Sequence, residues 1–343
     1  MSSPLVNVNT VDEVNNLLNN NSSVYPHKID YSSESNIYLN HTCLRIKDPK
    51  RSIDFYTNNL NFKLISVKKF PEWKFDLYFL SLNHSLDEKD IFNTNGILEL
   101  THNYGTESMP DYEVNNGNDV SKGRGFGHIC LTVFDIQKVQ EELLAKNVSF
   151  KKRLEDGNQK DICFIYDPDL YWIELVCYGN RPNYKQENEV LITEDRGVFF
   201  NHTMLRVKDP LVSLKFYCNV LNMTLLEFKH HPNAKFTVYF LSYKTADDFT
   251  NPRRAKEGIL ELTHNWGTED DEAFSYHNGN TNPQGYGHTC VTLKNAEAIC
   301  KSIEKVYEDI KWQPKWGEGG MKTIAFILDP DGYKVEIVNQ KGV

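Results

Sequence analysis

Alternating apolar and polar positions begin the first folded stretch of the chain and predict a β-strand over "HTCLRI" (41–46). The Asp-Pro pair at 48–49 is typical of a helix start, because Asp caps free amides and Pro fits the first turn. Apolar residues then recur at helical spacing, and three strand-like runs follow at 63–70, 75–82 and 97–102. The pattern predicts a β-α-β-β-β unit.

The same order of elements restarts after a loop rich in Gly and Asn. A strand-like "HICLTV", an amphipathic "DIQKVQEELLAKN", and then "DICFIYD" and "YWIELVCY" make up the second unit. The arrangement then returns, because "NHTCLRIKDP" (40–49) reappears as "NHTMLRVKDP" (201–210) and "GILELTHNYGTE" (96–107) as "GILELTHNWGTE" (258–269). The sequence therefore predicts a tandem duplication that contains four such units.

The repeat divides the chain into two halves of similar length. We expect an N-terminal extension over 1–35, a first domain over 36–178, a linker over 179–197 and a second domain over 198–340. The extension is rich in Asn and Ser, and its composition predicts partial order at most. Strands that return after a single helix predict an α+β fold, with four βαβββ modules in curved mixed sheets and the helices outside.

Composition narrows the class of partner. Of the 343 residues, 40% are apolar and 12% aromatic, which is ample for packed domains. The net charge of −9 provides no basic surface for nucleic acid. The seven cysteines contain no CxxC pair, and neither a secretory signal nor a membrane span is visible. We therefore expect a cytoplasmic protein with reduced thiols and no membrane partner.

Four histidines and four glutamates stand where a strand disfavours polar groups. Each unit has one His in its first strand and one Glu between apolar residues of its last strand. These residues are His41, Glu99, His128, Glu174, His202, Glu261, His288 and Glu336. A buried carboxylate needs a partner or a metal, and two His with two Glu suit zinc, nickel, manganese or iron. A single one could be a capped strand end, but recurrence in all four units favours metal binding.

Two further histidines recur in the duplicated "ELTH" segments. Side chains alternate along a strand, so His102 and His264 are predicted to point away from the glutamates at 99 and 261. They are therefore excluded from the expected ligand set.

The motifs "NHTMLRVKDP", "LELTHNWGTED", "RGFGH" and "DPDLYWIE" are similar to those of the glyoxalase I (lactoylglutathione lyase) family of the vicinal-oxygen-chelate superfamily. The resemblance covers about residues 36–340, and the double length resembles the fused form, in which one chain replaces a homodimer. It implies a lyase that isomerises the hemithioacetal of glutathione and methylglyoxal to S-lactoylglutathione by metal-assisted proton transfer through an enediolate. It also implies a monomer with Zn²⁺ (Ni²⁺ is the alternative), one ion per site and two per chain.

The resemblance further implies that each metal site is shared between the halves, a crossing that sequence spacing alone could not choose. One site would combine His41 and Glu99 with His288 and Glu336, and the other His202 and Glu261 with His128 and Glu174. Glu174 and Glu336 match the family's catalytic base. The positions that match the glutathione-binding residues are Arg45, Asn103, Arg124, Lys152, Arg206, Asn265 and Lys315.

The halves differ at one of these positions, because Gln284 in the second half stands where Arg124 stands in the first. We therefore hypothesise two working sites of unequal character, with tighter glutathione binding at the site that contains His128 and His202. Two alternatives stay open. One is an extradiol-type dioxygenase, which would use two His and one Glu on iron. The other is a metal-free module of the same fold that binds a small ligand.

Overall fold

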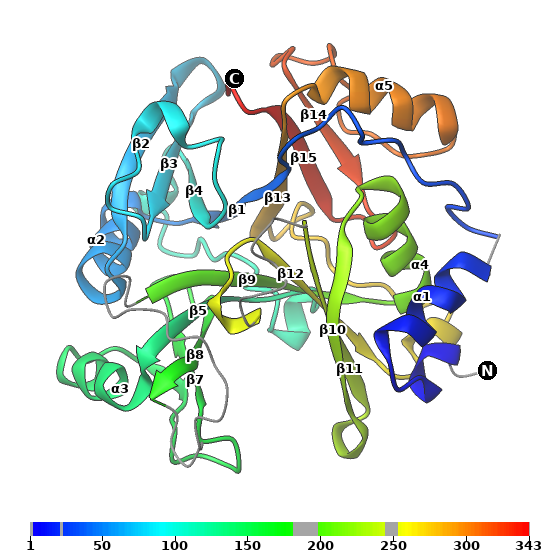
Figure 1. The fold of residues 1–343 in the computed structure, drawn as a ribbon. Coiled ribbons are helices and arrows are strands. Elements are labelled where there is room, and N and C mark those ends of the chain that lie inside the picture. The colour runs from blue at the N-terminus through cyan, green and yellow to red at the C-terminus, as the bar shows by residue number, and fades with distance from the viewer. Residues whose placement is uncertain (1–2, 21–22, 181–197, 244–252, 343) are drawn as a thin grey trace.

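The computed structural model describes residues 3–20, 23–180, 198–243 and 253–342, and in these ranges two mixed β-sheets form the centre of the protein (Figure 1). The seven-stranded sheet has the order β14-β15-β13-β1-β4-β3-β2, and the eight-stranded sheet β10-β11-β12-β9-β5-β8-β7-β6. The strands of the first sheet are β1 (Tyr38–Ile46), β2 (Lys63–Phe70), β3 (Phe75–Ser81), β4 (Ile97–Asn103), β13 (Tyr286–Leu293), β14 (Ile324–Leu328) and β15 (Lys334–Asn339). Those of the second are β5 (Phe126–Asp135), β6 (Phe150–Lys152), β7 (Ile162–Tyr166), β8 (Trp172–Asn180), β9 (Val198–Val207), β10 (Thr224–His231), β11 (Phe236–Ser242) and β12 (Ile259–Asn265).

The helices lie on the outside of the sheets, so the predicted α+β fold is confirmed (Figure 1). Their bounds are α1 (Val11–Asn20), α2 (Pro49–Leu60), α3 (Ile136–Ala145), α4 (Pro210–Lys215), which continues as a π-helical turn over Phe216–Val220, and α5 (Ala296–Val306). The predicted start of α2 is also confirmed, because the Asp48 side chain accepts a hydrogen bond from the Arg51 amide. None of the helices in the described ranges is long and apolar enough to cross a membrane.

The fourth unit departs from the predicted order of elements. Its first strand after α5 is reduced to a single bridge between Trp312 and Ile327, and only β14 and β15 follow in the described residues. Pro314 explains the loss, because proline has no amide to donate to a sheet ladder. The Gln313 amide still donates to the Phe326 carbonyl at 2.7 Å, so the segment keeps the position of a strand.

Each sheet joins strands from both halves of the chain. β1 pairs antiparallel with β13, and β5 pairs antiparallel with β9. The first unit therefore shares a sheet with the fourth, and the second with the third (Figure 1). The register of these two central pairs shifts around His41 and beside His128. Such β-bulges redirect side chains, and here they occur next to predicted metal ligands.

The two sheets meet at residues that occupy matched positions in the repeat. Thr42 and Thr203 share a hydrogen bond between their hydroxyl oxygens at 2.5 Å. The rings of Phe126 and Tyr286 stack with their centroids 5.2 Å apart. Contacts between equivalent residues indicate a pseudo-twofold axis between the halves. The predicted domain boundaries stay a prediction, and most of the predicted linker, residues 181–197, lies outside the described residues.

The N-terminal extension contains more structure than its composition predicted. Helix α1 buries Val14 and Leu18 and lies beside β10 and α4 (Figure 1). Upstream of it, the Ser3 amide donates to Glu269 at 2.7 Å, and the carbonyl of Val8 lies 2.8 Å from Nε2 of His230. The spacing of Val14 and Leu18 is helical, so this apolar stripe was present in the sequence among the asparagines.

Two turns with the sequence Asp-Pro-Asp connect units across the fold. In the first, the buried Asp167 carboxylate accepts hydrogen bonds from the Tyr56 hydroxyl at 2.9 Å and from the amides of Asp169 and Tyr171. The second turn repeats this arrangement, with Asp329 accepting from the Tyr217 hydroxyl at 2.9 Å. Each turn therefore fixes the helix of one unit against the last strand of another.

Replacing Asp167 by Asn is expected to flatten the dependence of stability on pH. Burial, reinforced by the charge of Asp169, raises the pKa of Asp167 to about 7, whereas the unfolded chain has the ordinary value near 4. Between these two values the folded state binds more protons, so the free energy of unfolding falls as pH rises. The variant lacks this decrease in the free energy of unfolding, which is at most about 1.4 kcal/mol per pH unit.

Urea unfolding of the wild type and the variant at several pH values between 5 and 7.5 measures this difference. The substitution Asp111→Asn, at an exposed carboxylate, is the matched control. Equal slopes for wild type and Asp167→Asn would contradict the prediction.

Candidate metal centres and cavity

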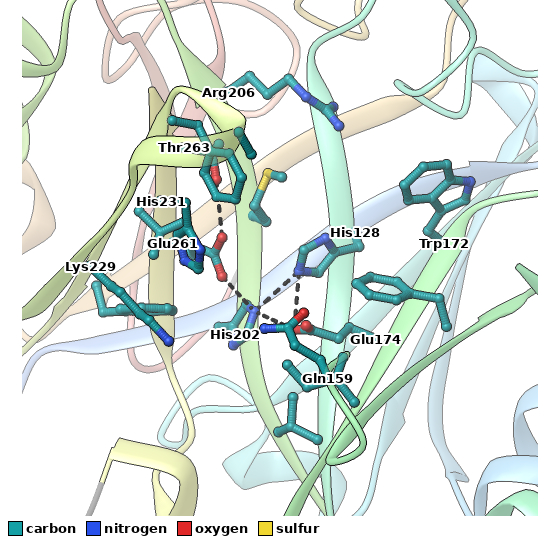
Figure 2. A pocket seen from close by; sticks show the side chains of 18 of the residues that line it. His128, Gln159, Trp172, Glu174, His202, Arg206, Lys229, His231, Glu261 and Thr263 are labelled. Carbon is teal, nitrogen blue, oxygen red and sulfur yellow. Dashed lines mark hydrogen bonds and ion pairs between the residues drawn. The ribbon is translucent and has the colours of Figure 1, made fainter. Parts of the chain in front are cut away.

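Four predicted ligands meet in the eight-stranded sheet. His128 on β5, Glu174 on β8, His202 on β9 and Glu261 on β12 are all buried, and their ligating atoms lie within 4.8 Å of one another (Figure 2). Nε2 of His202 is 3.0 Å from the Glu261 carboxylate, 3.2 Å from that of Glu174 and 3.2 Å from Nε2 of His128. We call this group the second centre.

The equivalent four residues meet in the seven-stranded sheet and form the first centre. Nε2 of His41 on β1 is 3.3 Å from the Glu99 carboxylate on β4 and 3.2 Å from the Glu336 carboxylate on β15. It is also 3.1 Å from Nε2 of His288 on β13. The structure thus brings together both sets of residues in the crossed combination that the family resemblance implies.

An asparagine before the first-strand histidine orients its ring in each centre. In the second centre, the Asn201 amide nitrogen donates to two backbone carbonyls, which leaves its oxygen to accept from Nδ1 of His202 at 2.7 Å. Nδ1 therefore carries the proton, and Nε2 presents a lone pair to the centre. Asn40 holds His41 in the same way at 2.8 Å.

The donor set fits a divalent metal. In the neutral tautomer that Asn201 selects, Nε2 of His202 can donate to neither of the two carboxylates that face it. A cation between these lone pairs would satisfy all of them, and two imidazoles with two carboxylates are ordinary ligands for zinc. The first centre fits a divalent metal for the same reason, because Asn40 fixes the tautomer of His41.

The electrostatics of the centres keep the proposed bases ionised. Burial alone would raise the pKa of Glu174, but the facing rings of His128 and His202 outweigh it and hold this pKa well below the ordinary value. In the first centre, burial is likewise outweighed by the facing imidazoles of His41 and His288, and the pKa of Glu336 is about 2. Both carboxylates are therefore available to accept a proton at neutral pH.

One cysteine also lies within ligand distance of the first centre. Sγ of Cys290 is grouped with His41 and Glu336, although the sequence pattern contained no cysteine ligand. Burial and the nearby charge of Glu336 raise the pKa of this thiol well above its ordinary value. A protonated thiol is a poor metal ligand, so Cys290 instead provides a hydrogen-bond donor beside Glu336. Cys290 lies two residues after His288 on β13, so the two side chains point to the same face of the strand. This spacing was the signal available in the sequence.

A cavity of about 790 Å³ opens onto the second centre (Figure 2). Because side chains alternate along a strand, Met204 and Arg206 follow His202 on the cavity face of β9, and Thr263 and Asn265 follow Glu261 on that of β12. The predicted glutathione residues Arg124, Arg206 and Asn265 all line this cavity.

Arg206 is fixed rather than mobile in its wall of the cavity. Its guanidinium donates to the carbonyls of Gly117, Gly125 and Phe126 and to the side chain of Asn118. Burial, with the charge of Arg124, lowers its pKa to about 10, so it remains cationic at neutral pH. In the first half, Arg45 makes the same kind of contacts, to the carbonyl of Tyr286 at 3.1 Å and the side chain of Asn280 at 2.9 Å.

Four predicted glutathione residues do not line this cavity, namely Arg45, Asn103, Lys152 and Lys315. Nζ of Lys152 instead donates to three backbone carbonyls, which include those of Gln159 and Ile162. Lys315 is exposed and lies 4.0 Å from Glu304. Asn103 ends β4, two residues beyond Thr101, which donates to Glu99 of the first centre at 3.2 Å.

Sequence reasoning missed several basic side chains that line the cavity. These are Lys229, His231, Arg253 and Arg254. The two arginines have no basic counterpart in the first half. The excluded histidines behave as predicted, since His102 and His264 bind Glu107 and Glu269 at 2.7 and 2.6 Å, away from the centres.

The chain matches one family twice, once in each half. The family model described as the Glyoxalase/Bleomycin resistance protein/Dioxygenase superfamily matches residues 38–175 and again 199–337. The chain therefore belongs to the Glyoxalase/Bleomycin resistance protein/Dioxygenase superfamily.

Full-length relatives narrow this class to glyoxalase I. The Glyoxalase I of Saccharomyces cerevisiae is 50% identical over 329 residues, which cover 94% of this chain and 98% of the relative. The Lactoylglutathione lyase of Schizosaccharomyces pombe is 46% identical and covers 88% of this chain and 96% of its own length. The crystal structure of glyoxalase I from Zea mays superposes with a TM-score of 0.67 at 27% identity, over 89% of this chain and 93% of that one.

Proposed function

We propose that the protein is a lactoylglutathione lyase that isomerises the glutathione–methylglyoxal hemithioacetal to S-lactoylglutathione. The observation that carries the proposal is the pair of buried His₂Glu₂ centres, one of which opens into a cavity lined by arginines. The names of the relatives at 50% and 46% identity support the same activity and do not favour the dioxygenase or the metal-free module.

Each centre would hold one divalent metal, with zinc the proposed ion. His128, Glu174, His202 and Glu261 would bind it in the second centre, and His41, Glu99, His288 and Glu336 in the first. When bound, the metal supplies positive charge beside the two vicinal oxygens of the adduct and lowers the free energy of the enediolate.

The chemical step is a proton transfer between adjacent carbons. In the second centre, the ionised Glu174 takes the proton from the carbon that carries sulfur and returns it to the neighbouring carbon, which was the carbonyl. The hydroxyl proton of the first carbon passes to the former carbonyl oxygen, so that the product is a thioester with a neighbouring hydroxyl. Glu336 has this role in the first centre. Glu261 faces the same imidazole as Glu174, at 3.0 Å, and is placed to share the proton shuttle.

Arginine side chains orient the tripeptide part of the substrate. Glutathione has two carboxylates, and a guanidinium binds a carboxylate with two parallel hydrogen bonds. Arg124 and Arg206 line one end of the cavity together with Asn265. We place the γ-glutamyl group at this end, which leaves the thiol-bound carbon to reach the metal ligands.

The proposed function is tested by adding the purified protein to the preformed hemithioacetal and following the absorbance of the thioester. We expect isomerisation at a rate proportional to protein concentration. A protein that contains metal but catalyses no isomerisation would exclude the lyase and favour the binding module.

The two centres are expected to differ in the Michaelis constant for the adduct. Glu336→Gln leaves only the second centre intact and Glu174→Gln only the first, where Gln284 replaces the cation at position 124. Because a charge-assisted hydrogen bond is lost there, we expect the KM of Glu174→Gln to be about tenfold higher. Arg124→Gln in the Glu336→Gln background should raise KM by a similar factor. Identical constants in the two single-centre proteins would exclude the difference.

We also propose that the enzyme is monomeric and cytoplasmic. Strands from both halves of one chain complete each centre, so a second copy is not required. The seven cysteines all lie in the described residues and form no disulfide there, and all but Cys218 are buried, which fits a reducing compartment.

A further inference from the structure

The loops before β4 and β12 occupy equivalent places beside the two centres. In the first half, the side-chain amide of Asn40 donates to the carbonyls of Ile91 and Thr94, both at 2.7 Å. In the second half, the amide of Asn201 donates to the carbonyls of Arg253 and Lys256 at 2.9 and 2.7 Å. Ile91 and Phe92 therefore correspond to Arg253 and Arg254.

The wall of the first centre at this place is mainly apolar. Ile91 and Phe92 are 2% and 5% exposed, and the ring of Phe92 lies 6.0 Å from that of Phe79 and 6.3 Å from the imidazole of His41. Met321, from the loop before β14, packs against the same cluster. A substituent that reaches this wall would meet aromatic and aliphatic carbon, with a single amine, Nζ of Lys68, 5.0 Å from the centre of the Phe92 ring.

The equivalent wall of the second centre contains two guanidinium groups, each in an ion pair. The guanidinium of Arg253 lies 3.7 Å above the ring of Phe240, which corresponds to Phe79 and lies 5.7 Å from the imidazole of His202. Arg253 is bound to Glu227 at 2.9 Å, and both line the cavity. Arg254 lines it as well and is bound to Asp161 at 2.9 Å.

This wall is separated from the arginines that we assign to glutathione. Arg206 lies four residues after His202 on β9, about 13 Å along the strand. The backbone carbonyl of Arg253 accepts a hydrogen bond from the side chain of Asn201, which lies on the other side of His202 along β9. The metal ligands therefore stand between the tripeptide end of the cavity and the Arg253 wall. The part of the adduct that extends past the ligands is the substituent contributed by the aldehyde.

We propose that the two centres divide their substrates by the polarity of the aldehyde substituent. The first centre, with Ile91 and Phe92, selects adducts of 2-oxoaldehydes that carry aryl or alkyl groups. The second, with Arg253 and Arg254, selects adducts whose substituent accepts hydrogen bonds. An apolar group there would remove water from partly buried guanidinium groups without replacing its hydrogen bonds, whereas a hydroxyl or carboxylate accepts from them. The inference rests on the proposed lyase activity.

The test compares kcat/KM for the glutathione adducts of phenylglyoxal and hydroxypyruvaldehyde in the two single-centre proteins. The ratio of phenyl to hydroxymethyl adduct is expected to be at least about tenfold higher in Glu174→Gln, which keeps the first centre, than in Glu336→Gln. In the Glu336→Gln background, the two arginines are then replaced by the residues at the equivalent positions of the first half, as Arg253→Ile with Arg254→Phe. This exchange should move the ratio towards that of the first centre.

Two controls separate the possible results. Lys301→Ile with Lys305→Phe makes the same change of charge on the exposed face of α5 and should leave the ratio unchanged. Arg253→Lys should retain the preference for the hydroxymethyl adduct. If the exchanged protein does not fold, the ratio in the two single-centre proteins decides. Equal ratios there overturn the inference, whereas loss of turnover with the methylglyoxal adduct in wild type overturns the proposed function itself.

Discussion

The double variant Glu174→Gln, Glu336→Gln is expected to lose about 10³-fold or more in kcat for the hemithioacetal. Each substitution removes the ionised carboxylate that we assign as base, and a positioned base contributes about 10²- to 10⁴-fold. Each also replaces a carboxylate of the metal set by a neutral amide. Both centres must be changed, because either one can sustain turnover when the other is lost. The assay is the initial rate of thioester formation at saturating substrate.

The single variants and two surface glutamates provide the controls for this result. Glu174→Gln and Glu336→Gln alone should each retain the turnover of the remaining centre. Glu141→Gln with Glu308→Gln, at exposed positions on or after helices, should keep the wild-type rate. A double variant of Glu174 and Glu336 that keeps a tenth of the wild-type kcat would rule out these residues as the bases.

Removal of metal by a chelator is expected to lower activity by about 100-fold or more and to destabilise the folded protein. A ligand that binds only the folded state stabilises it by about 2.7 kcal/mol at 100 times its dissociation constant. Without the metal, each centre also keeps two buried carboxylates close to one imidazole, as Glu99 and Glu336 lie around His41 at 3.3 and 3.2 Å. We therefore expect the midpoint of thermal unfolding to fall by several degrees.

Adding back single metals to the chelated protein identifies the preferred ion. Zinc should restore both activity and thermal midpoint, and metal analysis should find two ions per chain in wild type and fewer in Glu174→Gln. Full activity in a protein shown to be free of metal would contradict the assignment of the centres.

The sequence was sufficient to find the eight residues that meet in the two centres. His41 and Glu99 were detectable because a strand with alternating polarity gives each residue a defined face, and the repeat provided four independent copies of the pattern. How the copies combine was not contained in the spacing, because it depends on which strands pair. The pairing of β1 with β13 brings His288 to His41, and only the family resemblance anticipated it.

Other features of the site depend on contacts that a repeat comparison does not detect. Arg253 and Arg254 have apolar counterparts, so a search for likeness between the halves passed over them. Lys152 matched a glutathione position by sequence, yet its own loop offers three carbonyls within hydrogen-bond distance. The missing strand of the fourth unit had a visible cause in Pro314, since proline interrupts a ladder.

The pairing of the first unit with the fourth, and of the second with the third, has a consequence for a chain cut between its halves. Neither fragment would hold a complete centre, so activity would depend on fragment concentration, as in a dimer. The same geometry permits domain swapping, in which two intact chains exchange halves and each centre is completed by a neighbouring molecule. The tether between the halves thus sets the effective concentration of one for the other, and its length would control whether closed monomers or swapped dimers form.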